Sequence, residues 1–229
     1  MNKTIAGVTS EFLGAFALMF AGGAAIIHTG GENLLAIALA HGLILGTTVS
    51  ALMHISGGQF NPAVSIALGV IGKQPWSRAV QFTLAQLAGA VAAAVLLKWS
   101  FTPSEVQAVN LGATLGRMST GDGANLLGVL TLETVATFFL MIVILGSAVD
   151  QRGVGKTSAV GGFAIGLVVS ANILAIGPLT GASMNPCRSF GPALVGGHWA
   201  MHWAYWAAPV AGAVLAALAW KHLLADERA

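Results

Sequence analysis

The sequence predicts an all-α membrane protein with six transmembrane helices and two re-entrant half-helices, arranged as two inverted three-helix repeats. Three observations carry this prediction: charged residues make up only 8% of the 229 residues, six apolar runs reach spanning length, and one set of motifs occurs twice. A soluble domain carries about 25% charged residues. A hydrophobic content of 56% with a mean hydropathy of +0.81 therefore excludes a soluble domain and a disordered chain.

Each apolar run is long enough to cross a hydrocarbon core of about 30 Å as a helix. Helices are expected because lipid offers the backbone no hydrogen-bond partners. The first run contains Glu11 and five more runs follow it, so we interpret it as an uncleaved span rather than a signal peptide. The predicted spans are 5–27, 34–53, 79–99, 125–147, 158–176 and 200–220.

The connections between spans carry a charge bias that predicts orientation. With the N-terminus in the cytoplasm, seven basic residues fall inside and three outside, which favours two cytoplasmic termini in a multi-pass protein. The inner set is Lys3, Lys73, Arg78, Arg152, Lys156, Lys221 and Arg228, and the outer set is Lys98, Arg117 and Arg188. We expect the protein in the cell membrane (a plasma or inner membrane), with its Trp and Tyr side chains near the span ends.

An internal repeat divides the chain. Four matches recur in the same order at offsets of 122 to 124 residues: Glu11 with Glu133, Gly42-Leu43 with Gly166-Leu167, Ser56-Gly57 and Asn61-Pro62 with Thr180-Gly181 and Asn185-Pro186, and Gly89-Ala90-Val91 with Gly212-Ala213-Val214. The sequence thus predicts a single transmembrane domain, 1–229, with repeats 1–99 and 125–229 joined by the linker 100–124. Each repeat holds three spans, so the second copy is inverted relative to the first.

The two Asn-Pro pairs predict short helices that begin inside the membrane. Asn favours the N-cap and Pro the first helical position, so helices are expected near 61–71 and 185–195, each about 16 Å long and half a membrane thick. Their N-termini, each with roughly +0.5 charge, would meet at the midplane. Cations would be repelled there, while the amides of Asn61 and Asn185 donate to neutral molecules. The alternative is a pair of ordinary turn dipeptides.

Irregular backbone before each half-helix must line a water-filled path, because lipid-facing irregular backbone is not tolerated. We expect a ladder of carbonyl acceptors there from Gly57, Gly58, Gln59, Gly181, Ala182 and Ser183. Glu11 and Glu133 lie in apolar runs. Their duplication favours a structural role, in which each carboxylate accepts hydrogen bonds from the re-entrant loop of its own half, over a proton relay.

The sequence resembles the aquaporin (major intrinsic protein) family over nearly its whole length. The resemblance rests on six spans, the motif Asn61-Pro62-Ala63, the flanks His54-Ile55-Ser56-Gly57-Gly58 and Arg188-Ser189-Phe190-Gly191-Pro192, and the two glutamates. It implies a homotetrameric passive channel for water. The second motif departs from the family pattern, since it reads Asn185-Pro186-Cys187. We expect the Cys187 thiol close to the pore centre, where mercurials would reach it.

The resemblance also implies a selectivity filter, found by spacing from the two Asn residues: His41, Ile173, Ala182 and Arg188. Alternative interpretations are a packed core histidine for His41 and a snorkelling side chain for Arg188. This set is wider and less aromatic than in strict water channels and resembles the tonoplast and ammonia-permeable branches. Ammonia, hydrogen peroxide, urea and glycerol are thus plausible permeants beside water. Ser189 and Tyr205-Trp206 nevertheless favour the water-channel pattern over a dedicated glycerol facilitator.

Competing functions remain at this level. An aquaglyceroporin-type solute facilitator is one, and a proton-coupled secondary transporter, which can also use inverted repeats and broken helices, is another. A membrane enzyme lacks support, because no His, Asp or Glu cluster has metal-ligand spacing and no nucleophile is paired with a base. We expect no cofactor, no metal and no nucleic-acid partner. One cysteine excludes an intramolecular disulfide.

Overall fold

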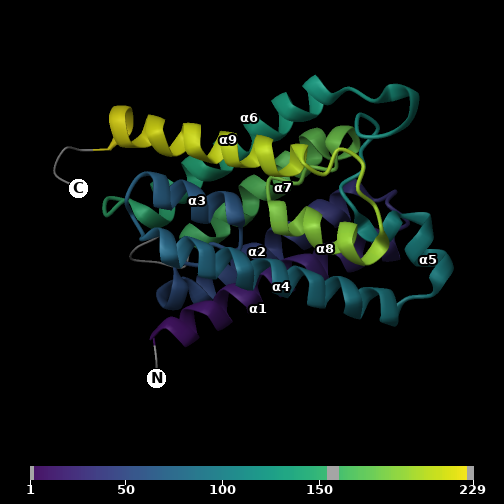
Figure 1. The fold of residues 1–229 in the computed structure, drawn as a ribbon, viewed down its shortest axis with the longest axis horizontal. Helices are drawn as coiled ribbons and strands as arrows, with labels where there is room; N and C mark the ends of the chain where they lie inside the picture. Colours follow the sequence, from purple (N-terminus) through teal and green to yellow (C-terminus); the bar gives the residue numbers. More distant parts are fainter. Residues whose placement is uncertain (1–2, 154–159, 226–229) are drawn as a thin grey trace.

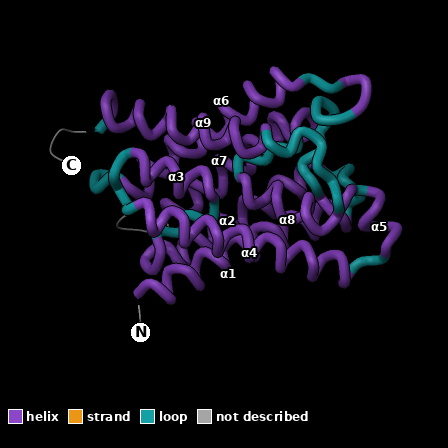
Figure 2. The backbone as a smooth tube through the Cα atoms, in the orientation of Figure 1, coloured by secondary structure: helices purple, strands orange, loops and turns teal. Residues whose placement is uncertain are grey.

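The computed structural model describes residues 3–153 and 160–225, and the described chain is helical with no strand (Figure 2). Six of its helices are long and apolar enough to cross a membrane, which confirms the six predicted spans. They are α1 (Lys3–His28), α2 (Leu34–Ser56), α4 (Trp76–Ser100), α6 (Leu126–Ile144), α7 (Val160–Thr180) and α9 (Ala204–Ala219). The basic residues Lys156 and Arg228 and the start of the fifth predicted span lie outside the described residues.

The described residues also form three short α-helices: α3 (Pro62–Val70), α8 (Pro186–Gly196) and α5 (Pro103–Ala108). The start of α1 and the described end of the chain after α9 lie at one face of the molecule, which we call the terminal face. The connection between α4 and α6, residues 101–125, lies at the opposite face, which we call the linker face (Figure 1). Helix α3 occupies the half nearer the terminal face and α8 the half nearer the linker face. Their N-terminal ends approach each other in the middle of the bundle.

Backbone-to-backbone contacts at glycines hold the long helices together. At the crossing of α2 and α7, a Cβ on Gly42 would lie 2.5 Å from the carbonyl oxygen of Gly166, and one on Gly166 would lie 2.1 Å from that of Gly42. No side chain fits such a gap, so the two helices cross with their backbones in contact. The helix pairs α1–α4 and α6–α9 show a matching contact, as Cβ atoms on Gly89 and Gly212 would each lie 2.2 Å from a carbonyl oxygen, of Phe12 and Thr134 respectively.

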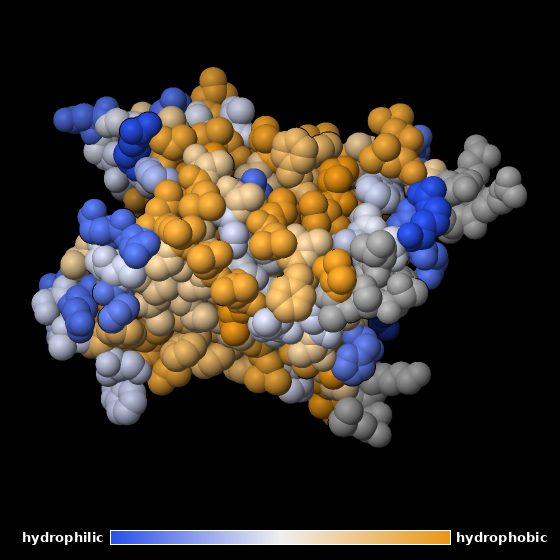
Figure 3. Space-filling model, turned by 180° about the vertical axis from the view of Figure 1, so that it is seen from behind, coloured by the Kyte–Doolittle hydropathy of each residue, from blue (hydrophilic) through white to orange (hydrophobic). Residues whose placement is uncertain are grey.

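Apolar side chains form a band around the middle of the molecule, and polar residues gather at its two ends (Figure 3). Many large apolar side chains in this band are exposed, as expected of a surface that faces lipid. Four exposed tryptophans lie at or near the helix ends, where interfacial aromatics are expected: Trp76, Trp99, Trp199 and Trp203.

The long helices extend beyond the predicted spans. Helix α2 continues to Ser56 and α7 to Thr180, and each ends only where a glycine, Gly57 or Gly181, adopts a left-handed φ of 96° or 90°. Helices α6 and α9 continue into wide π-type turns at Leu145–Val149 and Trp220–Leu224. Apolar runs locate the lipid-crossing part of a helix, but the helix itself continues through polar residues until its backbone is interrupted.

Candidate functional site: two half-helices facing one cavity

The two half-helices begin with nearly the same backbone geometry. Asn61 has φ −155° and ψ 118°, and its Oδ1 accepts from the backbone N–H of Ala63 at 2.9 Å. Asn185 has φ −153° and ψ 108°, and its Oδ1 accepts from that of Cys187 at 3.1 Å. A proline follows each cap at the first helical position. The caps predicted from the Asn-Pro pairs are therefore present, and each leaves its amide nitrogen free for other partners.

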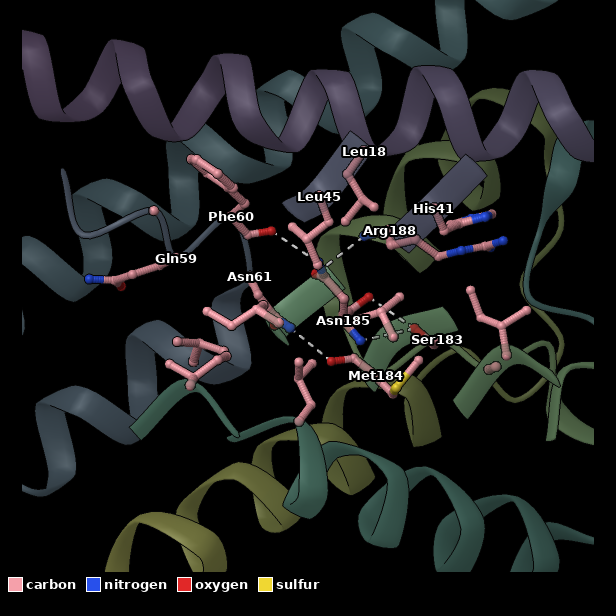
Figure 4. Close-up of a pocket in the computed structure, with 18 residues that line it drawn as sticks. Leu18, His41, Leu45, Gln59, Phe60, Asn61, Ser183, Met184, Asn185 and Arg188 are labelled. Carbon is pink, nitrogen blue, oxygen red and sulfur yellow. Dashed lines mark hydrogen bonds between the residues drawn. The ribbon is translucent and has the colours of Figure 1, made fainter. Parts of the chain in front are cut away.

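The two asparagines tie the re-entrant loops to each other. Asn61 Nδ2 donates to the carbonyl oxygen of Met184 at 2.8 Å, and Asn185 Nδ2 donates to that of Phe60 at 2.9 Å (Figure 4). Each amide nitrogen carries two hydrogens, so one hydrogen on each remains available to the cavity that both residues line. The sequence analysis predicted these donors but not their reciprocal bonds across the two halves.

The loops before the half-helices repeat an unusual conformation. Left-handed φ values occur at Gly57 and Gly181, at Gly58 (62°) and Ala182 (44°), and at Phe60 (48°) and Met184 (52°). Non-glycine residues rarely adopt this region, so the surrounding contacts must hold it. The loop backbone is thereby turned so that successive polar groups face a common centre.

A buried glutamate anchors each loop. Glu11 Oε1 accepts from the backbone N–H of Gln59 at 3.0 Å, and its Oε2 accepts from that of Phe60 at 2.6 Å. Ser56 and Gln86 donate to the same carboxylate through their side chains. Four donors satisfy a carboxylate that would otherwise be very costly to bury.

Glu133 makes the matching contacts in the second half. Its Oε1 accepts from the N–H of Ser183 at 2.9 Å and from the Thr180 hydroxyl at 2.6 Å, and its Oε2 accepts from the N–H of Met184 at 2.8 Å. At the repeat offset of 123, Pro209 corresponds to Gln86. Proline has no side-chain donor, so the Glu133 carboxylate has three donors rather than four. Both glutamates are fully buried, and neither lines a described cavity.

Three cavities follow one another through the molecule. The central one has a volume of about 30 Å³ and is lined by both asparagines. One of about 490 Å³ opens toward the linker face, and one of about 300 Å³ opens toward the terminal face. A water molecule needs about 10–15 Å³ of such space. The centre therefore has room for one or two waters in single file between two wider mouths.

The predicted filter residues lie where the central cavity meets the linker-face cavity. His41, Ile173 and Arg188 line both cavities, and Ala182 lines the central one. The side chains of His41 and Arg188 lie side by side there (Figure 4). Arg188 is 5% exposed, which excludes a side chain snorkelling to the surface.

Backbone carbonyls fix the two polar filter side chains. Arg188 Nη1 donates to the carbonyl oxygen of Gly112 at 2.8 Å, and His41 Nδ1 lies 2.8 Å from that of Ile37. Because a carbonyl only accepts, Nδ1 carries the proton, and Nε2 of the neutral ring is an acceptor. Gly112 belongs to the linker, which sequence analysis treated only as a connection. No sequence signal marks which linker carbonyl folds back over the filter.

The remaining predicted loop residues divide between the cavities. Gly58 and Gln59 line both the central and the terminal-face cavity, and Ser183 lines the central one. Gly57 lines only the terminal-face cavity, and Gly181 only the linker-face cavity. The six residues of the predicted carbonyl ladder therefore line the three cavities between them, and the orientation of their carbonyl oxygens along the path stays a prediction.

The Cys187 thiol lies close to the central asparagine, and its predicted access from the pore stays a prediction. Its side chain is 1% exposed, packs in an apolar cluster with Ala15 and Ala90, and lines none of the described cavities. The thiol lies 3.1 Å from Asn185 Oδ1. The helix that presents Asn185 to the cavity turns the second residue after it toward α1 and α4, so the thiol is near the midplane but faces away from the path. Pro62, Ala63 and Pro186 also contribute to packing and line none of these cavities.

Sequence analysis missed several side-chain contacts that shape the site, including those of Gln59, of which it predicted only the backbone carbonyl. Gln59, Ser65, Gln74 and Gln86 form a buried hydrogen-bonded network beside α3. In the second half, the Tyr205 hydroxyl donates to the carbonyl oxygen of Thr180. Polar residues in apolar spans were the available signal, but the sequence does not say which of them meet. The described residues contain no group of three or more metal-ligating side chains.

Comparisons with known proteins agree with this geometry. The family model described as "Major intrinsic protein" matches residues 2–220. "Probable aquaporin TIP3-2" of Arabidopsis thaliana is 38% identical, covering 96% of this chain and 84% of that protein, and "Aquaporin TIP4-4" of Zea mays is 41% identical, covering 96% and 86%. The X-ray structure of the aquaglyceroporin from Plasmodium falciparum superposes with a TM-score of 0.84 at 26% identity, covering 96% of this chain and 97% of that one.

Proposed function

The chain belongs to the major intrinsic protein family and is a passive membrane channel for water and small neutral solutes, and we propose that its permeation path is the line of three cavities with the filter at His41, Ile173 and Arg188. One observation carries this assignment above the others. Asn61 and Asn185, from the two halves of the sequence, cap two helices whose N-termini face one water-sized cavity.

The selectivity against ions follows from that cavity. Two helix N-termini, each equivalent to roughly +0.5 charge, make its centre unfavourable for cations. A water molecule there accepts from the free amide hydrogens of Asn61 and Asn185, so its own hydrogens point outward along the path. That orientation interrupts proton transfer along the file. Arg188 adds a full positive charge at the filter.

A coupled transporter needs a titratable group on the path near the midplane. The candidates Glu11 and Glu133 are fully engaged by loop donors and line no described cavity. Their contacts support the role of loop anchors. This favours a passive channel over the proton-coupled alternative, and the family identity makes it a channel rather than an enzyme.

The range of solutes follows from the filter walls. Ala182 and Ile173 give the constriction a small and an aliphatic side, which supports permeation by neutral molecules somewhat larger than water, such as ammonia, hydrogen peroxide, urea and glycerol. One solved structure that this chain resembles is an aquaglyceroporin, which supports the same interpretation. We propose water as the main permeant, with these solutes second.

Stopped-flow light scattering on proteoliposomes tests the assignment. Water, urea, glycerol and ammonia gradients are applied in turn, and a pH-sensitive dye inside the vesicles records proton leak. Water permeability well above that of bare lipid, with no added proton leak, is the expected result. Swelling no faster than bare lipid, or proton entry in proportion to solute flux, would reject a passive channel.

We also propose the assembly and orientation. The matched loop conformations and glycine crossings support two inverted repeats, 1–99 and 125–229, joined by 100–124. Family membership supports a homotetramer, which light scattering of the detergent-solubilised protein would measure. The described basic side chains Lys73, Arg78, Arg152 and Lys221 support a cytoplasmic terminal face, and we propose the cell membrane as the location. Protease access to tags at both ends in intact cells would test the orientation.

A further inference from the structure

We infer that Gly22, on α1, sets the aperture of the filter by leaving a notch into which the imidazole of His41 fits. The inference rests on the proposed function, because it takes His41 as part of the filter. Gly22 touches no permeant in this account. It is a positioning residue that acts through the histidine.

The packing of the ring against α1 carries the inference. A Cβ on Gly22 would lie 2.2 Å from His41 Nε2, 2.4 Å from Cδ2 and 2.5 Å from Cε1. Real Cβ atoms do not approach other atoms this closely, so any side chain at position 22 must displace the ring. The ring therefore occupies the volume that a side chain on α1 would take.

The displaced ring has one open direction. Its Nδ1 is held by the carbonyl oxygen of Ile37 at 2.8 Å, and α1 closes the side at Gly22. The free space beside the ring is the cavity that His41 lines together with Ile173 and Arg188. A methyl group at position 22 thus moves the imidazole into the path and narrows the filter.

The corresponding positions in the second half lack this arrangement. At the repeat offsets of 122 and 124, Gly22 corresponds to Ile144 and His41 to Ile165. Both isoleucines line the central and the terminal-face cavities. In the first half the His41 imidazole fills the space beside Gly22, whereas in the second half the two corresponding isoleucines both line the cavities. The notch is thus specific to the filter end of the path and is not a general feature of the repeat.

The test is Gly22→Ala, with the ratio of urea permeability to water permeability as the readout. Gly23→Ala is the matched control, because it adds the same methyl group one residue further on, where it meets the flexible ends of Leu97 and Met19 at 2.6 Å each. Neither of these side chains lines a described cavity. His41→Ala and the double variant Gly22→Ala/His41→Ala complete a double-mutant cycle.

We expect Gly22→Ala to lower the urea-to-water ratio roughly tenfold, the low end of what one methyl group changes in a selective pocket. Gly23→Ala should leave the ratio unchanged, and Gly22→Ala should have no effect when His41 is already alanine. An equal ratio in the Gly22 and Gly23 variants, or a drop that persists without the imidazole, would overturn the inference.

Assembly gives a second readout if Gly22→Ala alone does not fold. Recovery of folded protein in the double variant would place the conflict at the imidazole and support the inference, whereas failure of both variants would assign Gly22 to helix packing and overturn it. Loss of wild-type water permeability would instead reject the proposed function, so the two failures are distinguishable.

Discussion

The two ends of the central cavity use positions that correspond in the repeated sequence, yet these positions carry a histidine and an arginine at one end and aliphatic residues at the other. At an offset of 124, His41 corresponds to Ile165 and Arg188 to Val64. His41 and Arg188 border the linker-face cavity, whereas Ile165 and Val64 border the terminal-face cavity. The two halves share the same backbone arrangement, but the two polar side chains at these positions stand at one end only. The corresponding positions at the other end are aliphatic.

The largest expected effect is the loss of folded protein when one of the two loop-anchoring glutamates, Glu11 and Glu133, is replaced. Glu133→Gln replaces one accepting oxygen with an NH₂ group that faces backbone N–H donors, which leaves at least one buried donor unpaired at a cost of about 1–3 kcal/mol. We expect loss of most folded protein, measured by size-exclusion chromatography and thermal unfolding in detergent.

Glu11→Gln is the matched variant and should be milder. Gln86 donates to Glu11, and its own Oε1 has no hydrogen-bond partner within the described chain. Rotation of the Gln86 amide can therefore offer an acceptor to the new NH₂ group. Equal destabilisation of the two variants would show that the extra donor in the first half gives no tolerance.

The next prediction concerns a variant that makes the two ends of the cavity more alike. Arg188→Val gives the filter end the residue found at the other end, Val64. Without the buried guanidinium and its N–H donors, urea and glycerol permeability should rise roughly tenfold relative to water permeability. This change corresponds to a permeation barrier about 1.4 kcal/mol lower. Vesicle swelling in solute gradients measures this ratio.

Arg188→Lys is the control, because lysine keeps the charge but not the planar guanidinium. We expect it to retain most of the exclusion of larger solutes. If the valine variant shows the wild-type ratio, the polar end does not select solutes, and the comparison between the two ends loses its functional meaning.

A smaller effect concerns the corresponding residues Ala63 and Cys187, the third positions of the two motifs. Both are buried and line no described cavity. We expect Cys187→Ala to leave water permeability unchanged and brief exposure to mercuric chloride to inhibit the wild type no more than the variant. Rapid inhibition of the wild type alone would show that the thiol is reachable from the path, as the sequence first suggested.

The smallest effect lies on the terminal face. Hydrogen bonds from the side chain and backbone of Arg152 lower the pKa of Asp150 to about 2. This contribution to stability is present above the ordinary pKa of about 3.9 and is lost as the pH falls toward 2. Asp150→Asn should slightly lower the midpoint of thermal unfolding at pH 7, with the difference from the wild type vanishing near pH 2. A difference that is constant with pH would contradict this.

The sequence predicted the parts of the molecule that are set by local chemistry. Apolar runs indicated six spans, and the Asn-Pro pairs indicated where α3 and α8 begin, because a cap and a proline at the first position are short-range features. The spans and caps needed no knowledge of how distant segments pack. The family resemblance, through spacing from the asparagines, implied His41 and Arg188, which the structure brings together where two cavities meet.

What the sequence could not predict depends on contacts between distant segments. Whether the Cys187 thiol faces the path depends on the rotation of α8 against α1 and α4, and no pattern within the motif encodes that rotation. The carbonyl of Gly112 reaches Arg188 through a linker whose backbone follows no regular period. The notch at Gly22 is equally hidden, because a glycine in an apolar helix is usually a packing residue.

The reciprocal bonds between Asn61 and Met184, and between Asn185 and Phe60, also bear on how the protein is made. The acceptor for Asn61 lies 123 residues later in the chain, so the ribosome delivers the first re-entrant loop long before its partner exists. During synthesis the first re-entrant loop therefore lacks its hydrogen-bond partner, and the two reciprocal bonds can form only after the second half has been inserted.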